Sequence, residues 1–244
     1  MTFNSIEFLI FYPIVLAAYF LLPEKFRWPV LLAASYLFYM WFSAPLFFLI
    51  LFTTAVSWVS SLVIERTDSI AKKRLCLILT LVTSLGVLVF FKYYNFLAGS
   101  VMSVGALFGA SFDITLQNLI LPVGISFYTF QTLSYAIDVY RGDIRAERHF
   151  GWYALFVSFF PQLVAGPIER PDNLLPQLRE RHAWNHADAI AGAKRMLAGF
   201  FKKVVVADLL AAYVNAVYNS PDTATGAGVV IASCMFAVQI YCDF

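Results

Sequence analysis

Apolar runs long enough to enter a lipid bilayer recur along almost the whole chain. At about 1.5 Å per residue, a helix of roughly 17–20 residues crosses a hydrocarbon core of about 30 Å if the bilayer thins slightly. A weaker stretch, Phe96–Phe112, is rich in Gly, Ala and Ser, and we interpret it as either a packed span or a lumenal hairpin. The strong runs, of which the second is short, are Ser5–Leu22, Trp28–Phe42, Pro45–Ile64, Leu75–Phe91, Leu119–Val139, Phe150–Ile168 and Thr225–Phe244.

The low charge content indicates that these runs face lipid rather than a soluble core. Charged residues make up 13% of the chain and hydrophobic residues 61%, against about 25% and 45–50% in soluble proteins. A soluble enzyme, a nucleic-acid binder and a disordered tail are excluded on this ground. We therefore predict an all-α fold, a polytopic bundle of transmembrane helices that forms a single membrane domain over residues 1–244.

The basic residues set an orientation for this bundle. Arg66 and Lys72–Arg74 lie in one short loop, which the positive-inside rule places in the cytoplasm. Counting three spans back puts Met1 outside. Counting forward returns the loop Arg141–Arg148 to the cytoplasm, provided that Phe96–Phe112 does not cross.

The run Phe150–Ile168 does not fit a simple crossing. It is interrupted by Pro161, Gly166 and Pro167, which break helices and free backbone polar groups. Seven of the 17 basic residues lie between Glu169 and Lys203, and a full crossing would place them outside. We therefore predict a re-entrant or broken segment that returns residues 169–203 to the cytoplasmic side.

A basic helix follows this segment at Ala189–Val217. Its basic side chains fall near one face, with apolar side chains opposite, which is typical of an amphipathic helix lying at the membrane surface. An interfacial anchor without a catalytic role explains this pattern. The basic side chains are Lys194, Arg195, Lys202 and Lys203.

A polar stripe marks the run that begins near Leu121. Gly124, Tyr128, Gln131, Tyr135 and Asp138 follow one another at steps of 4, 3, 4 and 3, so they share one helix face. Polar groups in a membrane helix face the bundle interior or a wet cavity. The stripe is therefore either interhelical hydrogen-bond glue or a substrate-lining face, and its last carboxylate has Arg141 as an available partner.

The break itself supplies a second group of candidates. Backbone groups freed beside Gln162, Gly166 and Pro167 can bind polar substrate groups, and the adjacent Arg170 can meet a phosphate or carboxylate. A purely structural kink explains the same residues. Both interpretations stay open at this point.

The histidines point to no metal or catalytic site. His182 and His186 are four residues apart, but Ala183 stands where a zinc protease has Glu, and no third ligand lies nearby. His149 stands at the edge of an apolar run. We expect no metal site and no complete catalytic constellation in this chain.

Seven segments spread over nearly the whole chain are Phe8–Pro23, Phe91–Phe96, Leu121–Gln131, Asp138–Gly142, Phe159–Arg170, Gly199–Val204 and Gln239–Phe244. In this order they resemble motifs of the membrane-bound O-acyltransferase (MBOAT) family, most closely its bacterial, alginate O-acetyltransferase-like branch. The branch usually has Tyr where Pro171 stands. In the family the last of these segments is followed by further helices with an essential His, so the resemblance covers an N-terminal portion and provides no catalytic residue. The chain alone is expected to be inactive.

The resemblance implies transfer of an acetyl or similar group to an extracytoplasmic polysaccharide such as alginate, by a multi-pass protein of the bacterial inner membrane. It implies no bound cofactor; the donor would be an acyl-CoA or an acyl-carrier protein. The expected partners are the lipid bilayer, the donor, and the polysaccharide acceptor or a periplasmic acyl-transfer protein, without nucleic acid. The residues expected along the substrate tunnel are Tyr128, Gln131, Tyr135, Asp138, Gln162, Gly166, Pro167 and Arg170.

Two other classes explain the same polar stripe and broken segment. A transporter or channel would use both features, although its usual internal repeat is not visible here. A non-catalytic scaffold subunit of an envelope-polymer export complex is the other alternative.

Overall fold

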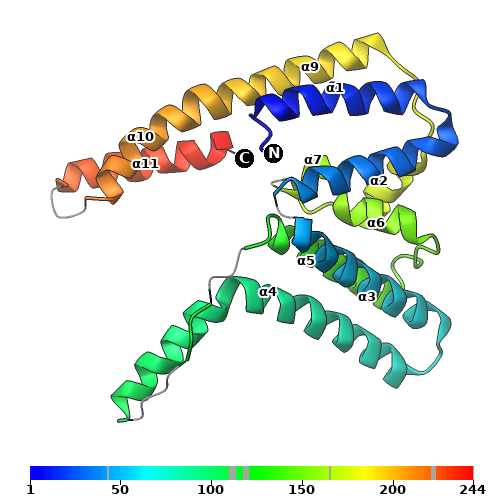
Figure 1. Cartoon of the computed structure of the whole chain (residues 1–244), viewed down its shortest axis with the longest axis horizontal. Helices are drawn as coiled ribbons and strands as arrows, with labels where there is room; N and C mark the ends of the chain where they lie inside the picture. The colour runs from blue at the N-terminus through cyan, green and yellow to red at the C-terminus, as the bar shows by residue number, and fades with distance from the viewer. Residues whose placement is uncertain (43, 110–113, 118–120, 165, 221–223, 244) are drawn as a thin grey trace. The chain divides into compact units, whose positions relative to one another are not determined.

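The computed structural model describes residues 1–42, 44–109, 114–117, 121–164, 166–220 and 224–243. Helices account for nearly all regular structure in these ranges, and no strand occurs in them (Figure 1). The expected boundaries at Phe112, Leu119 and Phe244 lie outside the described residues. In chain order the helices are α1 (Ile6–Leu21), α2 (Glu24–Met40), η1 (Ala44–Leu46), α3 (Phe47–Arg66), α4 (Ile70–Leu107), α5 (Ile125–Arg141), α6 (Phe150–Ser158), α7 (Phe160–Leu163), α8 (Pro171–Arg179), α9 (His186–Phe200), η2 (Phe201–Ala207), α10 (Asp208–Tyr218) and α11 (Gly226–Asp243).

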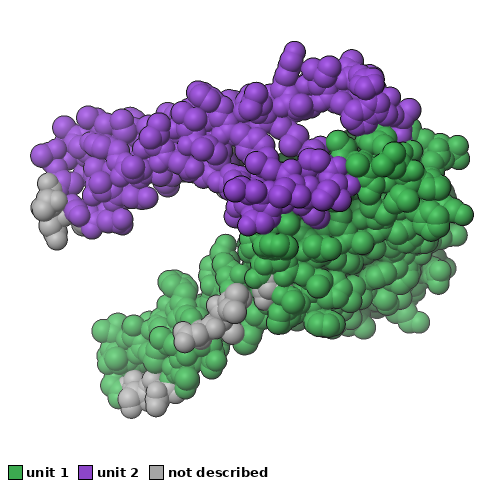
Figure 2. Space-filling model, turned by 45° about the horizontal axis from the view of Figure 1, so that its top comes forward, with its two compact units in different colours: residues 1, 15–181 green, residues 2–14, 182–244 purple. Residues whose placement is uncertain are grey.

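The chain divides into two compact units, which Figure 2 shows in different colours. Unit 1 contains Met1 and Val15–Arg181, and unit 2 contains Thr2–Ile14 and His182–Phe244. Each unit is described by itself below. The single membrane domain expected from the sequence stays a prediction.

Three helical stretches of the described chain are long and apolar enough to cross a bilayer: Ala44–Arg66, Ile70–Leu107 and Gly226–Asp243. Helix α1 is apolar but shorter. The other apolar runs form shorter helices that do not meet this requirement of length. Helices α2 and α5 have 17 residues each, α6 has 9 and α7 has 4. The predicted all-α membrane fold is confirmed, whereas the number of full crossings stays a prediction.

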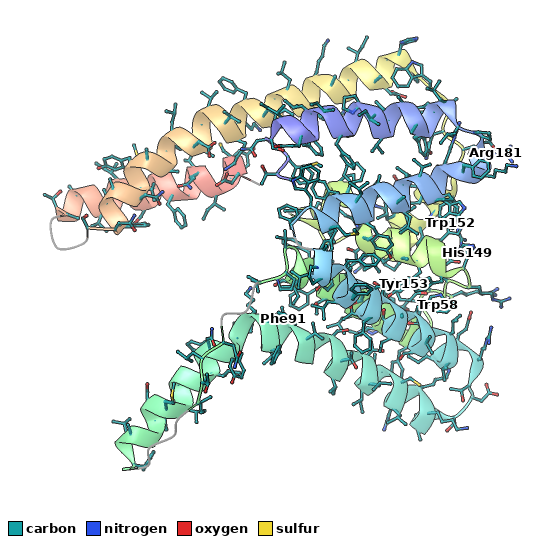
Figure 3. All side chains as sticks on the ribbon, viewed as in Figure 1. Trp58, Phe91, His149, Trp152, Tyr153 and Arg181 are labelled. Carbon is teal, nitrogen blue, oxygen red and sulfur yellow. The ribbon has the colours of Figure 1, made fainter. Side chains whose placement is uncertain are left out.

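Helix α4 corrects the division of its region into two separate runs. Its 38 residues continue from Leu75–Phe91 into the stretch that begins at Phe96, because no proline interrupts this part of the chain. At about 1.5 Å per residue it extends for roughly 57 Å, nearly twice a hydrocarbon core. Figure 1 shows that α4 changes direction along its length, and Figure 3 places Phe91 near that bend.

The chain returns beside α4 after the helix ends. The Asn95 side-chain amide donates to the Gln117 carbonyl at 2.7 Å and accepts from the Gln117 N–H at 2.9 Å, and Tyr94 donates to the Thr115 carbonyl at 3.2 Å. Of the two interpretations for Phe96–Phe112, the hairpin is closer to this arrangement. The polar residues of the Phe91–Phe96 motif thus hold a returning backbone.

Small hydroxyl residues line the buried face of α3 in unit 1, where it packs against α4 and α5. Small side chains let membrane helices approach closely. Their hydroxyls are satisfied mainly within the helix: Thr54 donates to the Ile50 carbonyl at 2.6 Å, and Ser61 to the Ser57 carbonyl at 2.7 Å. Ser57 donates to the Thr54 carbonyl at 3.0 Å within the helix, and it also bonds the hydroxyl of Tyr153 in another helix at 2.8 Å. Figure 3 labels Tyr153 in this region.

Unit 2 contains a long helical rod that includes a π-helical stretch. Helix α9 runs directly into η2 and then α10, and α11 packs against the last two. The sequence predicted one regular amphipathic α-helix over Ala189–Val217, so the π-helical geometry of Phe201–Ala207 corrects that expectation. Within this stretch Lys203 pairs with Asp208 at 2.9 Å and with Asp243 of α11 at 2.5 Å. The position of this rod at a membrane surface stays a prediction.

Candidate functional site

The helix break in unit 1 lies just before Pro161. Helix α6 ends at Ser158 and α7 begins at Phe160. The Phe160 N–H donates to the Ser35 hydroxyl at 3.2 Å rather than continuing the helical ladder, and Pro161 has no N–H to donate. The carbonyls one turn earlier therefore lose their helical partners.

One freed carbonyl gathers two of the predicted site residues. The Phe156 carbonyl accepts from the Gln131 side-chain amide at 2.8 Å and from the Gln162 side-chain amide at 3.4 Å. Both glutamine side chains are buried, with 3% and 8% of their surface exposed. Buried carbonyls need a partner, so this contact gives both amides a structural task at the break. It favours the hydrogen-bond interpretation of Gln131 over a side chain facing an open path.

Glycine is required where α5 begins against the end of α7. Gly124 has φ of +71°, in the left-handed region, and a Cβ there would overlap the carbonyl oxygen of Leu163. This close approach brings the first turn of the polar stripe against the broken segment. The start of Leu121–Gln131 is thus shaped by backbone contact.

Tyr128 and Tyr39 form a buried aromatic pair near this contact. Their ring centroids lie 6.5 Å apart in an edge-on arrangement, and both side chains are almost fully buried. Neither hydroxyl has a hydrogen-bond partner among the described residues. The predicted tunnel role of Tyr128 stays a prediction.

Tyr135 belongs to a different polar cluster. Its hydroxyl accepts from the Glu147 N–H at 2.6 Å, and its ring packs on Tyr153 with centroids 4.5 Å apart. The stripe therefore separates along its length: Gln131 serves the helix break, and Tyr135 holds the loop between α5 and α6.

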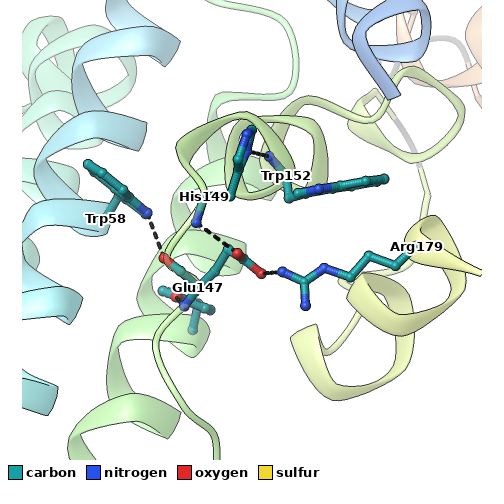
Figure 4. A network of polar contacts seen from close by, with 6 residues as sticks. Trp58, Glu147, His149, Trp152 and Arg179 are labelled. Atoms are coloured by element: carbon teal, nitrogen blue, oxygen red, sulfur yellow. Dashed lines mark hydrogen bonds and ion pairs between the residues drawn. The ribbon is translucent and has the colours of Figure 1, made fainter. Parts of the chain in front are cut away.

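Glu147 is the centre of that second cluster (Figure 4). Its carbonyl accepts from the Trp58 indole N–H at 2.7 Å, and its carboxylate accepts from the His149 N–H at 2.8 Å. The carboxylate also forms an ion pair with Arg179. The Glu147 side chain is only 7% exposed, whereas that of Arg179 is 49% exposed. One buried acid thus links α3, α5, the start of α6 and the end of α8.

The ion pair fixes the path of the broken segment. Glu147 precedes α6 and Arg179 ends α8, so the chain leaves this level of unit 1 through α6 and returns to it through α8. A segment that crossed unit 1 once would end at its opposite side. This geometry is the one expected for a re-entrant path.

His149 caps the N-terminus of α6 with its side chain. Its Nδ1 accepts from the Trp152 N–H at 3.4 Å, and its ring packs edge-on against Trp28 with centroids 5.0 Å apart. His186 accepts from the Trp184 indole at 3.3 Å. Among the residues described, no group of three or more His, Cys, Asp and Glu has the arrangement of a metal site.

The remaining predicted residues lie toward the surface. The Gly166 N–H donates to the Gln162 carbonyl at 2.9 Å, while Pro167 and Arg170 are exposed. Asp138 is half-buried and lies close enough to Arg170 for the two charges to interact. Arg141, the available partner named from the sequence, also lies close enough for its charge to interact with Asp138, but the two form no ion pair at contact distance in the described structure.

Sequence reasoning missed the Glu147 cluster. Trp58 is one aromatic residue among many in an apolar run, and Glu147 stands in a charged loop that normally indicates solvent. Arg179 is 32 positions from its partner. None of the three gives a local signal, because the contact exists only after α8 folds back.

These features define an all-α membrane protein built around a broken helix with buried polar partners. The chain is 38% identical over 249 residues to a protein of Pseudomonas aeruginosa named as a probable alginate O-acetylase, AlgI, and 37% identical over 250 residues to its counterpart in Azotobacter vinelandii. It is 30% identical over 274 residues to a peptidoglycan O-acetyltransferase of Helicobacter pylori. The resemblance to alginate O-acetyltransferases predicted from the sequence is confirmed.

These similarities cover this chain and its relatives to different extents. They cover 99–100% of this chain but 47%, 49% and 51% of the three relatives, so the chain spans about half the length of the curated relatives it matches. No family model matches the chain, and no solved structure matches it.

Proposed function

We propose that this chain forms part of a membrane O-acetyltransferase that acetylates hydroxyl groups of an extracytoplasmic polysaccharide. The observation that supports this most directly is its similarity, over its full length, to proteins named as alginate O-acetylases and a peptidoglycan O-acetyltransferase. The broken helix with its buried amides is compatible with a polar path through a membrane protein.

The reaction is a simple acyl transfer. The hydroxyl oxygen of the acceptor attacks the acyl carbonyl carbon of an activated donor, and for a thioester the C–S bond breaks. The hydroxyl proton passes through a base to the departing thiolate, so that an ester and a thiol are formed. In the described structure Nδ1 of His149 and Nδ1 of His186 each accept a hydrogen bond, so neither of these two nitrogens takes the proton in this arrangement.

The wider assignments follow the same proposal. The donor is an acyl-CoA or an acyl-carrier protein, and the acceptor is a polysaccharide or a periplasmic partner that passes the acyl group on. The protein lies in the bacterial inner membrane as a multi-pass protein. The substrate path runs beside Tyr128 and Gln131, with the Gln162–Arg170 segment near its cytoplasmic end.

The test is a chimera with the Pseudomonas aeruginosa relative. This chain, joined to the part of that protein which it does not match, is expressed in cells lacking their own alginate O-acetylase, and ester-linked acetate on the polymer is measured. Acetylation by the chimera, without acetylation by residues 1–244 alone, is the expected result.

A matched control separates failure of folding from failure of function. The relative's own first half, expressed with its second half as two polypeptides, shows whether the halves assemble. If that pair acetylates and a folded chimera does not, the proposal is wrong. If polymer export changes instead while acetylation does not, the scaffold or transporter alternative takes its place.

A further inference from the structure

An open pocket of about 370 Å³ lies in unit 1 beside the Glu147 cluster. Glu65 comes from the last turn of α3, and Arg145 and Arg148 come from the loop between α5 and α6. Ala146 and Glu147, between the two arginines in sequence, and Arg179 of α8 complete the lining. Three separate elements therefore contribute charged side chains to one concave surface.

The loop that carries the two arginines is held in place. Three hydrogen bonds fix the backbone at and beside Glu147: one to the Tyr135 hydroxyl, one from the Trp58 indole and one from the His149 N–H to the Glu147 carboxylate. Both flanking arginines are exposed while Ala146 and Glu147 are buried. Because this backbone is already fixed, a ligand that binds here does not have to order the loop, and less binding free energy is lost than at a mobile basic loop.

The charges in the pocket are not balanced. Arg179 is already paired with Glu147. Arg145, Arg148 and Glu65 make no ion pair with any residue that the structure describes, which leaves two guanidinium groups facing one carboxylate. Guanidinium groups match the oxygens of a phosphate in charge and geometry, often with two hydrogen bonds each.

The position of the pocket at the end of a candidate spanning helix is a second observation. Glu65 directly precedes Arg66, the last residue of Ala44–Arg66. This stretch is one of the three that are long and apolar enough to cross a bilayer. A crossing by this stretch would place the pocket where the helix meets the headgroup region. Basic pockets at this level meet phosphate groups of lipids, and also soluble phosphate esters approaching from the aqueous side.

We propose that this pocket binds an organophosphate, with its phosphate group against Arg145 and Arg148. The remaining carboxylate, Glu65, favours a ligand that carries a cationic group beside the phosphate, as phosphoethanolamine headgroups do. The shared chemistry has two sources, a phospholipid headgroup or a soluble phosphate ester such as coenzyme A. The inference does not depend on acyl transfer, because binding is measured directly.

The experiment uses the full chain purified in nanodiscs of neutral glycolipid. Phosphatidylethanolamine retained on the protein is measured by native mass spectrometry, and coenzyme A binding is measured by calorimetry in a separate arm. The variant Arg145→Gln/Arg148→Gln is expected to weaken binding of the recognised ligand by about tenfold or more. Arg66→Gln/Arg74→Gln, which removes the same charge from exposed residues outside the pocket, is the matched control.

A third variant distinguishes the two sources. Glu65→Gln is expected to weaken retention of phosphatidylethanolamine if the lipid is the ligand, and to strengthen coenzyme A binding if the soluble ester is. Retention of one probe that depends on Arg145 and Arg148 supports the proposal and identifies the source. Binding of neither probe, or equal losses in the pocket variant and its control, overturns it. Both arginines are exposed, so a thermal unfolding curve close to that of the parent chain is expected for every variant.

Discussion

The two units of this chain differ in how far their side chains are buried within the unit. Unit 1 buries amides, hydroxyls and a carboxylate among apolar side chains. Many of its hydroxyls bond carbonyls of their own helix, while Ser57, Gln131 and Tyr135 bond groups of other elements. In unit 2 helix α9 has no buried residue, and only Ala207, Val214 and Ala232 are buried in the helices that follow. Large apolar side chains such as Leu197 and Tyr241 are 71% exposed.

This difference shows which contacts determine the structure of each unit. In unit 1 the helix arrangement depends on hydrogen bonds and an ion pair between buried polar groups. The strength of each of these contacts depends closely on its geometry. Unit 2 offers apolar surface without internal partners, so its surroundings must be lipid or further protein. Substitutions of similar chemistry should therefore have large effects in unit 1 and small ones in unit 2.

The largest effect is expected at Gly124. Gly124→Ala places a Cβ against the Leu163 carbonyl in a backbone conformation that disfavours side chains, and should lower the free energy of unfolding by about 2–5 kcal/mol. Unfolding in mixed detergent micelles measures the loss. Gly142→Ala, with φ of +83° but open space, should lose only about 1–2 kcal/mol. Equal losses at the two glycines would contradict the close contact.

The next effect is expected at Glu147. Glu147→Ala removes a buried carboxylate from its ion pair with Arg179 and from the His149 N–H, which should cost about 2–3 kcal/mol of unfolding free energy. The control is Glu24→Ala, whose ion pair with Arg181 is exposed on both sides and should be worth less than about 1 kcal/mol. If both variants unfold alike, the buried cluster does not stabilise unit 1.

The two glutamines at the helix break allow a double-mutant cycle. Gln131→Leu and Gln162→Leu each leave the other amide on the Phe156 carbonyl, so each should cost about 1 kcal/mol. The double variant leaves that carbonyl unpaired and should lose more than the two single losses combined. Strict additivity in the unfolding experiment would show that the amides do not share this acceptor.

The same variants sharpen the functional interpretation of Gln131. In the chimera, Gln131→Leu should reduce acetyl transfer more than it reduces the amount of folded protein if the amide also orients substrate. Transfer that falls only in proportion to folded protein would leave the amide with its structural role alone.

The smallest effect is expected in unit 2, at Lys203. Its ion pairs with Asp208 and Asp243 are partly exposed, so Lys203→Met should change the unfolding free energy by less than about 1 kcal/mol. The Asp243 and Asp208 carboxylates raise the pKa of Lys203 above its usual 10.5. This contribution is fully present below the unfolded pKa and is lost as pH rises through the raised folded pKa. Parent and variant should therefore differ by a constant amount between roughly pH 6 and pH 9, and a difference that disappears within that window would contradict the assignment.

The sequence predicted the helices of this protein better than their contacts. Apolar runs and their prolines located α1, α3 and the break before Pro161, because hydrophobicity and a missing N–H are local properties. The continuity of α4 beyond Phe91 was missed, since small residues lower hydropathy without ending a helix. Gln131 was identified as inward-facing from its spacing, but its partner is a carbonyl freed 25 residues later, which no local pattern reveals.

The π-helical stretch Phe201–Ala207 has a consequence for comparing this protein with its relatives. A regular helix turns by about 100° per residue, so one residue inserted or deleted would rotate everything after it to a different side. A wider turn with i→i+5 bonds absorbs such a residue while the rod remains unbroken. A one-residue insertion or deletion at this place would thus leave the rod unbroken, and a helical wheel drawn through Ala189–Val217 without a gap assigns the wrong faces to α10.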